Sequence, residues 1–295
     1  MSRILITGAS SVVGRYLLPI LEAQRRPVIA LSRRSDNSRG SVMWLCSDIG
    51  RGNLPPEVGT AEVLIHLAPL PLLIPLLCDG NLTRLHRVVA IGTTSVFTKS
   101  DSRVLYERTA MANQWQAEQA LVEAGKRLGF CWTLFRPTLV YDGIHDKNIV
   151  NIAHFISRFR FFPIVKPGSG LRQPLHAVDL AWACAAVLDK PATEFQSYNL
   201  AGNQVLSYRE MVEQVFRSLG KQPRIIPIWP WLYRRLLFIM GIHPRYRYIN
   251  SEIAGRMNLD MVFDISAARR DFGFSPRSFH INYPDDYAMG IEGQR

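Results

Sequence analysis

The stretch from Ile4 to Gly14 constrains the fold of this chain more than any other part of the sequence. The apolar run Ile4-Leu5-Ile6 is typical of a buried strand, and a turn containing Gly8 follows it directly. From Arg15 onward, apolar residues recur at helical spacing. A strand, a tight turn and a helix start in this order can bind an anion, because free backbone N–H groups and the positive end of the helix dipole face the space above the turn. The segment therefore predicts a dinucleotide-binding domain.

The predicted turn and helix start supply the phosphate-binding part of the cofactor site. Glycine in the turn lets a pyrophosphate approach the backbone closely. Ser11 stands where a middle glycine is often found, and its hydroxyl can still donate a hydrogen bond to a phosphate. The residues expected to bind the cofactor here are Gly8, Ser10, Ser11, Val12, Val13 and Gly14.

The end of the second predicted strand indicates which dinucleotide is bound. An acidic residue at this place would accept hydrogen bonds from the adenosine ribose and repel a 2′-phosphate. The chain has Leu31-Ser32-Arg33-Arg34 instead. Two guanidinium groups suit a 2′-phosphate in charge and in geometry. Arg33 and Arg34 therefore favour NADP(H), with NAD(H) as the alternative if both arginines are only solvated surface residues.

Strands and helices alternate over the first two thirds of the chain, which predicts an α/β fold with a doubly wound parallel sheet. The predicted strands are 3–6, 28–31, 42–45, 63–67, 87–91 and 133–136, and a helix is expected over 110–125. Later segments predict a smaller substrate lobe, with Ser207 and Glu210 at capping-box spacing before an apolar helix. We assign 1–140 and 172–201 to the Rossmann domain, and 141–171 and 202–295 to the lobe.

The net charge of +11 is concentrated in one stretch. No acidic residue lies between Glu213 and Glu252, whereas several arginines and a lysine do. Within it, 229–247 combines tryptophan, tyrosine and arginine side chains, a mixture that suits a membrane interface or a protein partner. The alternative is a solvated basic face on a helix that packs on the sheet. No recognition motif for nucleic acid accompanies the charge, so no specific nucleic-acid binding is expected.

Composition also bears on the compartment and on metals. The first predicted strand begins at Arg3, and the longest nearly uncharged run, 63–78, is broken by prolines and too short to cross a bilayer. The sequence predicts a cytoplasmic protein, with a peripheral position at the inner membrane face as an alternative. The cysteines are scattered without ligand spacing, so no metal site is expected.

The whole chain resembles the extended or atypical short-chain dehydrogenase/reductase superfamily, of the nucleotide-sugar epimerase/dehydratase type. Several segments carry this resemblance in the family's order. They are Thr7-Gly8 through Gly14 (a TGxxGxxG-like loop), Ser47-Asp48-Ile49, His66-Leu67-Ala68, Arg136-Pro137 through Tyr141, Arg172 through Ala181 with His176 and Asp179, Tyr198-Asn199-Leu200, and 264–276. The resemblance implies that Asp48 and Ile49 contact the adenine, and that Leu67, Ala68, Thr93 and Pro137 lie along the cofactor.

The family's proton-transfer pair is missing from the sequence. Family enzymes use a Ser or Thr after the fifth strand, matched here by Thr93, and a Tyr-x-x-x-Lys on the next helix. Aligning Glu118 with the glutamate that often follows places Ala110 at the tyrosine and Gln114 at the lysine. Tyr106 and Tyr141 are candidate replacements for the tyrosine, and Lys99 could supply charge, although packing or solvation explains each of them too.

The resemblance also implies a substrate. Arg172 matches an arginine that pairs with the diphosphate of a nucleotide sugar, and a bidentate guanidinium suits this role. His176 is expected beside it, orienting the end of its strand, and Asp179 is expected to cap the following helix. The sequence predicts an NADP(H)-dependent oxidoreductase or epimerase-like enzyme that acts on a nucleotide sugar or a related polar metabolite. The alternative is an inactive NADPH-binding structural, sensing or assembly protein.

Overall fold

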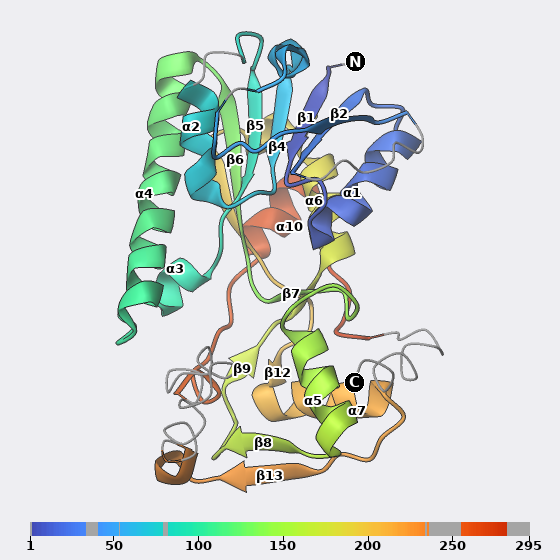
Figure 1. The fold of residues 1–295 in the computed structure, drawn as a ribbon, viewed down its shortest axis with the longest axis vertical. Helices are drawn as coiled ribbons and strands as arrows, with labels where there is room; N and C mark the ends of the chain where they lie inside the picture. The colour runs from blue at the N-terminus through green and yellow to red at the C-terminus, as the bar shows by residue number, and fades with distance from the viewer. Residues whose placement is uncertain are drawn as a thin grey trace.

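The computed structural model describes residues 2–33, 41–52, 54–78, 82–233, 235 and 255–281. A central sheet lies between two layers of helices, and a smaller lobe lies beyond one edge of this sandwich (Figure 1). The lobe contains the helices α5 (Ile149–Phe159) and α7 (Tyr208–Ser218) and the strands β8 (Phe162–Val165) and β13 (Ile225–Ile228). The helices that flank the sheet are α1 (Val12–Ala23), α2 (Leu73–Cys78), α4 (Leu105–Leu128) and α6 (Ala177–Ala186).

The sheet has seven strands in the order β11-β6-β5-β4-β1-β2-β3, and every neighbouring pair is parallel. The strands are β1 (Ile4–Thr7), β2 (Val28–Ser32), β3 (Met43–Cys46), β4 (Val63–His66), β5 (Arg87–Ile91), β6 (Cys131–Pro137) and β11 (Gln196–Leu200). The predicted doubly wound α/β fold is confirmed, and the predicted strands lie within a few residues of the observed ones.

Helices cover both faces of the sheet, which explains why the strands read as nearly continuous apolar runs. Side chains alternate between the faces: Ile4 and Ile6 belong to one core cluster, and Leu5 belongs to the other. The first cluster includes residues of α1 (Val12–Ala23), α6 (Ala177–Ala186) and α10 (Ser266–Phe272). The second includes residues of η1 (Pro56–Thr60), η2 (Leu70–Leu72), α2 (Leu73–Cys78) and α4 (Leu105–Leu128).

The lobe has a core of its own. Residues from α5 (Ile149–Phe159), α7 (Tyr208–Ser218) and the parallel pair β8 (Phe162–Val165) and β13 (Ile225–Ile228) form a third apolar cluster. The predicted capping box at the start of α7 is confirmed: the Ser207 hydroxyl accepts a bond from the Glu210 N–H, and the Glu210 carboxylate accepts one from the Ser207 N–H. These reciprocal bonds satisfy backbone donors that the helix leaves unpaired.

Short two-residue pairings join the lobe to the sheet region. They are β7 (Val140–Tyr141) with β10 (Leu175–His176), and β9 (Leu171–Arg172) with β12 (Leu206–Ser207). The remaining elements are α3 (Ser95–Thr98) and η3 (Pro191–Thr193). Beyond the lobe, the chain returns to the sheet, where α10 packs on β11. The predicted division placed these residues in the lobe, but Ile265, Ala268 and Phe274 are part of the sheet's core.

Candidate functional site

The strand order reverses direction between β1 and β4, and parallel α/β sheets bind ligands at this point, beyond the carboxyl ends of the strands. The turn after β1 lies against the end of β4 there. Gly8 has a φ of +69°, and a Cβ on it would lie 2.7 Å from the Ala68 backbone nitrogen. A Cβ on Gly14 would lie 2.1 Å from the Ala9 carbonyl oxygen. Both positions therefore require glycine, because a side chain at either one would collide with the backbone packed against it.

The start of α1 presents backbone donors above this turn. Ser11 is the N-cap, and its hydroxyl accepts a hydrogen bond of 3.2 Å from the Gly14 N–H. The first turn of α1 contains no acidic residue. Helix geometry leaves the N–H groups of Val12 and Val13 without intrahelical partners, so they remain available to an anion. These residues fit the pyrophosphate of a dinucleotide.

A buried histidine fixes the ends of β1 and β4 relative to each other. His66 Nδ1 lies 2.8 Å from Thr7 Oγ1, and its Nε2 lies 3.2 Å from the Pro69 carbonyl oxygen. Burial lowers the pKa of His66 to about 4, so the ring is neutral at physiological pH. We call this region, made of Gly8, Ser11, His66 and Ala68 with their neighbours, the dinucleotide corner.

The remaining predicted cofactor residues surround this corner. Ser32 Oγ donates to Ser10 Oγ over 3.2 Å at the end of β2, and the next residue, Arg33, is exposed. Arg34 lies outside the described residues. Asp48 accepts a bond from the Gly50 N–H and shapes its own turn, and Ile49 is buried in the core. The Leu67 N–H donates to the Thr7 carbonyl, and Pro137 ends β6.

The next corner of the sheet edge is organised by α4 and differs from the family pattern. Glu118 is 1% exposed and accepts two bonds from Arg136, at 2.9 Å from Nε and 2.7 Å from Nη2. Gln114 is 9% exposed, and its Nε2 has no hydrogen-bond partner among the described residues, nor has Glu118 Oε1. Both atoms lie close to Gly92, whose added Cβ would be 2.9 Å from Glu118 Oε1 and 3.2 Å from Gln114 Nε2. We call this region the α4 corner.

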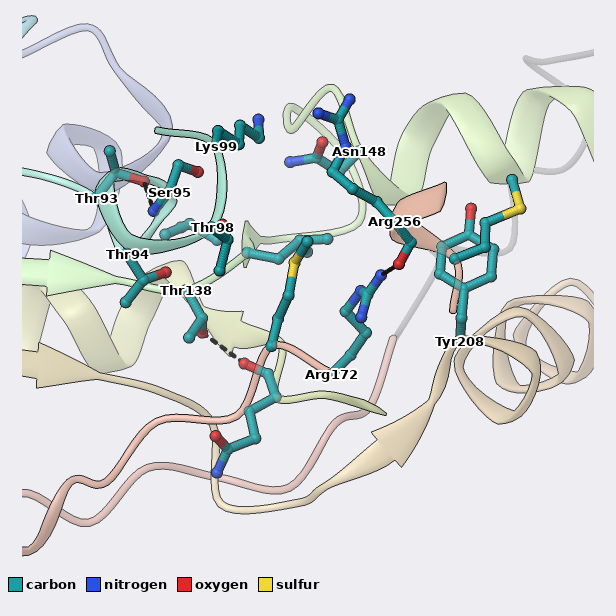
Figure 2. A pocket seen from close by; sticks show the side chains of 15 residues that line it. Thr93, Thr94, Ser95, Thr98, Lys99, Thr138, Asn148, Arg172, Tyr208 and Arg256 are labelled. Carbon is teal, nitrogen blue, oxygen red and sulfur yellow. Dashed lines mark hydrogen bonds between the residues drawn. The ribbon is translucent and has the colours of Figure 1, made fainter. Parts of the chain in front are cut away.

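A cavity of about 380 Å³ lies between the α3 loop and the lobe. Figure 2 shows Thr93, Ser95, Thr98 and Lys99 on its α3 side and Arg172 and Tyr208 on the opposite side. Within the described part of the chain, its lining contains three cations and no carboxylate; the cations are Lys99, Arg172 and Arg256. The cavity therefore suits a polar substrate that carries negative charge.

Two of these three cations are already engaged. Arg172 donates from Nη1 to the carbonyl oxygens of Leu171 and Leu259, and from Nη2 to that of Arg256. Arg256 forms a bidentate pair with Glu107, at 2.7 and 3.0 Å. This pairing lowers the pKa of Glu107 to about 2, opposed by a smaller effect of burial. Arg172, predicted to bind substrate, thus lines the cavity while it also holds the segment around 256–259.

The structure brings only some of the predicted catalytic and substrate residues together. Thr93 lines the cavity, and its Oγ1 accepts a 3.1 Å bond from the Ser95 N–H. Tyr106 is 81% exposed on the first turn of α4 and is outside the cavity lining. The Tyr141 hydroxyl is bonded to the backbone N–H and carbonyl of His280, and burial raises its pKa to about 12. This placement gives Tyr141 a packing role.

The structure gives His176 and Asp179 roles other than those that the sequence suggests. His176 caps α6, since its Nδ1 accepts a 3.2 Å bond from the Val178 N–H. Asp179 was expected to be the cap, but this prediction is wrong: its carboxylate accepts from the backbone N–H and the Nε of Arg277. Sequence reasoning missed Asn148, Tyr208, Arg256, Met257 and Met261 as cavity residues. Apart from Tyr208, which follows the Ser207 cap, they come from segments without a motif, and only the fold brings them to the cavity.

Comparison with known proteins agrees with this architecture. No model of a known protein family matches the chain. An uncharacterized protein of Sinorhizobium fredii is 30% identical over 52% of this chain and 38% of its own length. The NADH dehydrogenase [ubiquinone] 1 alpha subcomplex subunit 9, mitochondrial, of Arabidopsis thaliana is 26% identical over 76% of this chain and 59% of its own length. The chain thus spans well under two thirds of both curated relatives.

A further relative and two solved structures match over larger shares of their own lengths. The NAD(P)H azoreductase of Xenophilus azovorans is 25% identical over 76% of this chain and 77% of its own length. The UDP-glucuronic acid 4-epimerase of Bacillus cereus, in complex with NAD, superposes with a TM-score of 0.72 at 15% identity, over 98% of this chain and 99% of that one. The UDP-glucose 4-epimerase of Thermus thermophilus, also with NAD, gives 0.69 at 16% identity, over 99% and 100%.

These likenesses concern the fold: the chain has the fold of the two epimerases solved with NAD. Ala110 and Gln114 stand at the two positions where the sequence resemblance leads one to expect the tyrosine and lysine of a Tyr-x-x-x-Lys pair.

Proposed function

We propose that this protein is an NADP(H)-dependent oxidoreductase that acts on a nucleotide sugar or a related anionic metabolite. The observation that carries the proposal is the position of Thr93, which follows β5 at the sheet edge and lines a cationic cavity beside a dinucleotide corner. When bound, the nicotinamide supplies hydride transfer to or from a substrate carbon. Thr93 polarises the reacting oxygen, and the α1 amides with Ser11 hold the pyrophosphate.

Two observations support the preference for a phosphorylated dinucleotide. The β2 end carries Ser32 in place of an acidic residue, and Arg33 is exposed beside it. A guanidinium at this corner can form paired bonds to a 2′-phosphate. Asp48, Ile49, Leu67, Ala68 and Pro137 are proposed to complete the site along the adenine and nicotinamide ends.

The cofactor preference is tested with the change Arg33→Asp. We expect NADPH affinity to fall about tenfold or more, because an attraction of at least 1.4 kcal/mol is removed and replaced by repulsion. NADH affinity should hardly change. Fluorescence titration of both nucleotides measures this, with Arg127→Asp as a control on an exposed arginine near the end of α4. Equal affinity of the unaltered protein for NADH and NADPH would refute the preference.

The substrate class is tested by following NADPH absorbance with a panel of nucleotide sugars, free sugars and simple carbonyl compounds. The relatives of known structure are named as epimerases of UDP-sugars, and the cavity lining is cationic. We expect turnover with anionic substrates and little with neutral ones. Equal rates with neutral carbonyl compounds would contradict the proposal that the substrate is anionic.

A second function follows from the missing pair. Two relatives are named as subunit 9 of NADH dehydrogenase, from Arabidopsis thaliana and Dictyostelium discoideum. With Ala110 and Gln114 on α4, the chain could instead be an inactive protein that uses NADPH as a structural or sensing ligand in an assembly. Tight NADPH binding without turnover over the whole panel would favour this function.

In that second case, the segment 229–247 is the proposed contact with a membrane or a protein partner. Its described residues include Trp229 and Trp231, which are 56% and 59% exposed. Lys166 Nζ lies 4.4 Å from the Trp229 ring centroid, and Arg235 lies over the Trp231 ring. Residues 234 and 236–247 lie outside the described residues. Across the described ranges, no helix is both long and apolar enough to span a membrane.

A further inference from the structure

An oxidoreductase of this type needs a group that moves the proton of the substrate hydroxyl, and α4 does not provide one. Ala110 has no functional group, and the Gln114 amide does not titrate. The described residues that line the cavity include no histidine and no carboxylic acid. Besides the arginines, only Lys99 and Tyr208 can exchange a proton there.

Tyr208 is poorly suited to this task. Burial raises the pKa of its hydroxyl to about 12, with a smaller opposing effect of Arg172. Its ring also lies 5.6 Å from the Arg172 guanidinium carbon, on the lobe side of the cavity. A group with so high a pKa holds its proton throughout the physiological range and is a weak base catalyst.

Lys99 lies on the same side of the cavity as Thr93. It follows α3 directly, and the residues from Thr93 to Lys99 form the α3 side of the cavity (Figure 2). The side chain is half-buried. Among the residues that the structure describes, its ammonium has no hydrogen bond and no carboxylate within ion-pair distance. Lys99 is thus the one cation of the lining whose donors are not already engaged.

The surroundings of Lys99 make its ammonium group easier to deprotonate. Burial lowers its pKa, Arg256 lowers it further, and Glu107 opposes this effect. Glu107 is itself held by both guanidinium nitrogens of Arg256, so its charge is largely matched. Arg172 is a third charged group in the same cavity. A lysine among cations in a partly dry site can act as a general base.

We propose that Lys99 is the proton-transfer residue of this enzyme and takes the place of the missing tyrosine; the proposal rests on the proposed oxidoreductase function. In the oxidation direction, the substrate O–H bond breaks and its proton passes to the neutral amine of Lys99. The O–H electron pair forms the carbonyl π bond, and the C–H pair leaves as the hydride that the oxidised dinucleotide accepts. Reduction reverses each transfer, with the Lys99 ammonium as the acid.

The test compares Lys99→Met and Lys99→Arg in the full chain. Both should lower kcat/KM by about 10²–10⁴-fold while NADPH affinity stays within about twofold, because a general acid–base group contributes this much. Lys99→Arg keeps the positive charge but cannot release its proton. The control is Lys126→Met, a lysine exposed at the end of α4, which should keep full activity.

A second measurement observes the amine directly. Lysines labelled by reductive ¹³C-methylation are titrated by NMR, with the Lys99→Met spectrum as the assignment. The Lys99 signal should titrate at lower pH than the Lys126 signal, and the basic limb of kcat/KM should follow it. A Lys99 signal that titrates at the same pH as the exposed lysines would overturn the proposal. An active Lys99→Arg variant would also overturn it, because it would show that only the positive charge at this position is needed.

The failure of the underlying function gives a different result. If the unaltered protein binds NADPH but turns over no substrate, the oxidoreductase function fails, and the role of Lys99 fails with it. If the unaltered protein is active and Lys99→Met matches it, only the assignment of Lys99 fails.

Discussion

The dinucleotide corner and the α4 corner lie along the same edge of the sheet, yet they differ in whether their buried polar atoms have hydrogen-bond partners. In the first, Thr7, His66 and Ser11 all have partners, and the helix amides that remain are those a phosphate needs. In the second, Gln114 Nε2 and Glu118 Oε1 are buried without partners among the described residues. On the proposed function, cofactor binding and proton transfer are therefore separable parts of this fold, and the usual proton-transfer pair is the part that is missing.

The largest expected effect concerns the ion pair of the α4 corner. Arg136→Met should lower the free energy of unfolding by about 3–5 kcal/mol, because it leaves the Glu118 carboxylate buried without a counter-charge. Urea denaturation followed by circular dichroism measures the change. The double variant Glu118→Leu/Arg136→Met should recover much of the loss. If the single variant lost less than about 1 kcal/mol, the pair would be behaving as a solvated one.

The next effect concerns the dinucleotide corner and depends on pH. The pKa of His66 is about 4 in the folded protein and near 6.5 in an unfolded chain, so the unfolded state takes up the proton first as pH falls. The stability that the neutral His66 ring contributes is fully present above about pH 6.5. It is lost progressively as the pH falls toward 4, by up to about 3 kcal/mol of unfolding free energy. His66→Asn, whose amide can keep the bond to Thr7, should flatten this slope. A variant as acid-sensitive as the unaltered protein would contradict the assignment.

The smallest effect separates the two corners most sharply. Gln114→Leu removes a buried amide whose nitrogen has no hydrogen-bond partner in the described part of the chain, so the free energy of unfolding should stay equal or rise by about 1 kcal/mol. NADPH affinity should fall about fivefold, because the sequence resemblance aligns Gln114 with the lysine of the Tyr-x-x-x-Lys pair, and its unpaired amide nitrogen is proposed to donate to the bound cofactor. Thermal unfolding and nucleotide titration measure the two changes. Gln116→Leu, on the exposed face of the same helix, is the matched control. Unchanged affinity would show that the amide does not face the dinucleotide.

Much of the fold could be predicted from local patterns. The apolar runs at 4–6 and 87–91 and the Ser207–Glu210 spacing depend on neighbours in sequence, and the structure has them where they were expected. The two-residue pairings β7–β10 and β9–β12 were missed because so short a strand has no detectable period. The N-cap of α6 was predicted at Asp179 but is His176. An acidic residue is common both at the N-cap and in the first turn of a helix, so the sequence does not distinguish these two positions.

The residues of the candidate site also differ in whether the sequence could predict them. Gly8 and Gly14 can be recognised because the constraint on them comes from residues nearby in the chain or in a neighbouring strand. The cavity cannot, because Arg256 and Met261 reach it only through the packing of a distant segment. Tyr106 was a candidate because it lies four residues before Ala110. It lies in the first turn of α4, however, and its side chain is exposed to solvent.

The pairing of Glu107 with Arg256 has a consequence for the order of folding. These residues are 149 positions apart, whereas the contacts of the phosphate-binding turn lie within the first part of the chain. Closing so long a loop is entropically costly and is repaid only after the intervening segments have packed. The turn can thus take shape early, while the cavity is completed at the end. A nascent or partly folded chain would form the turn after β1 before it had the cavity.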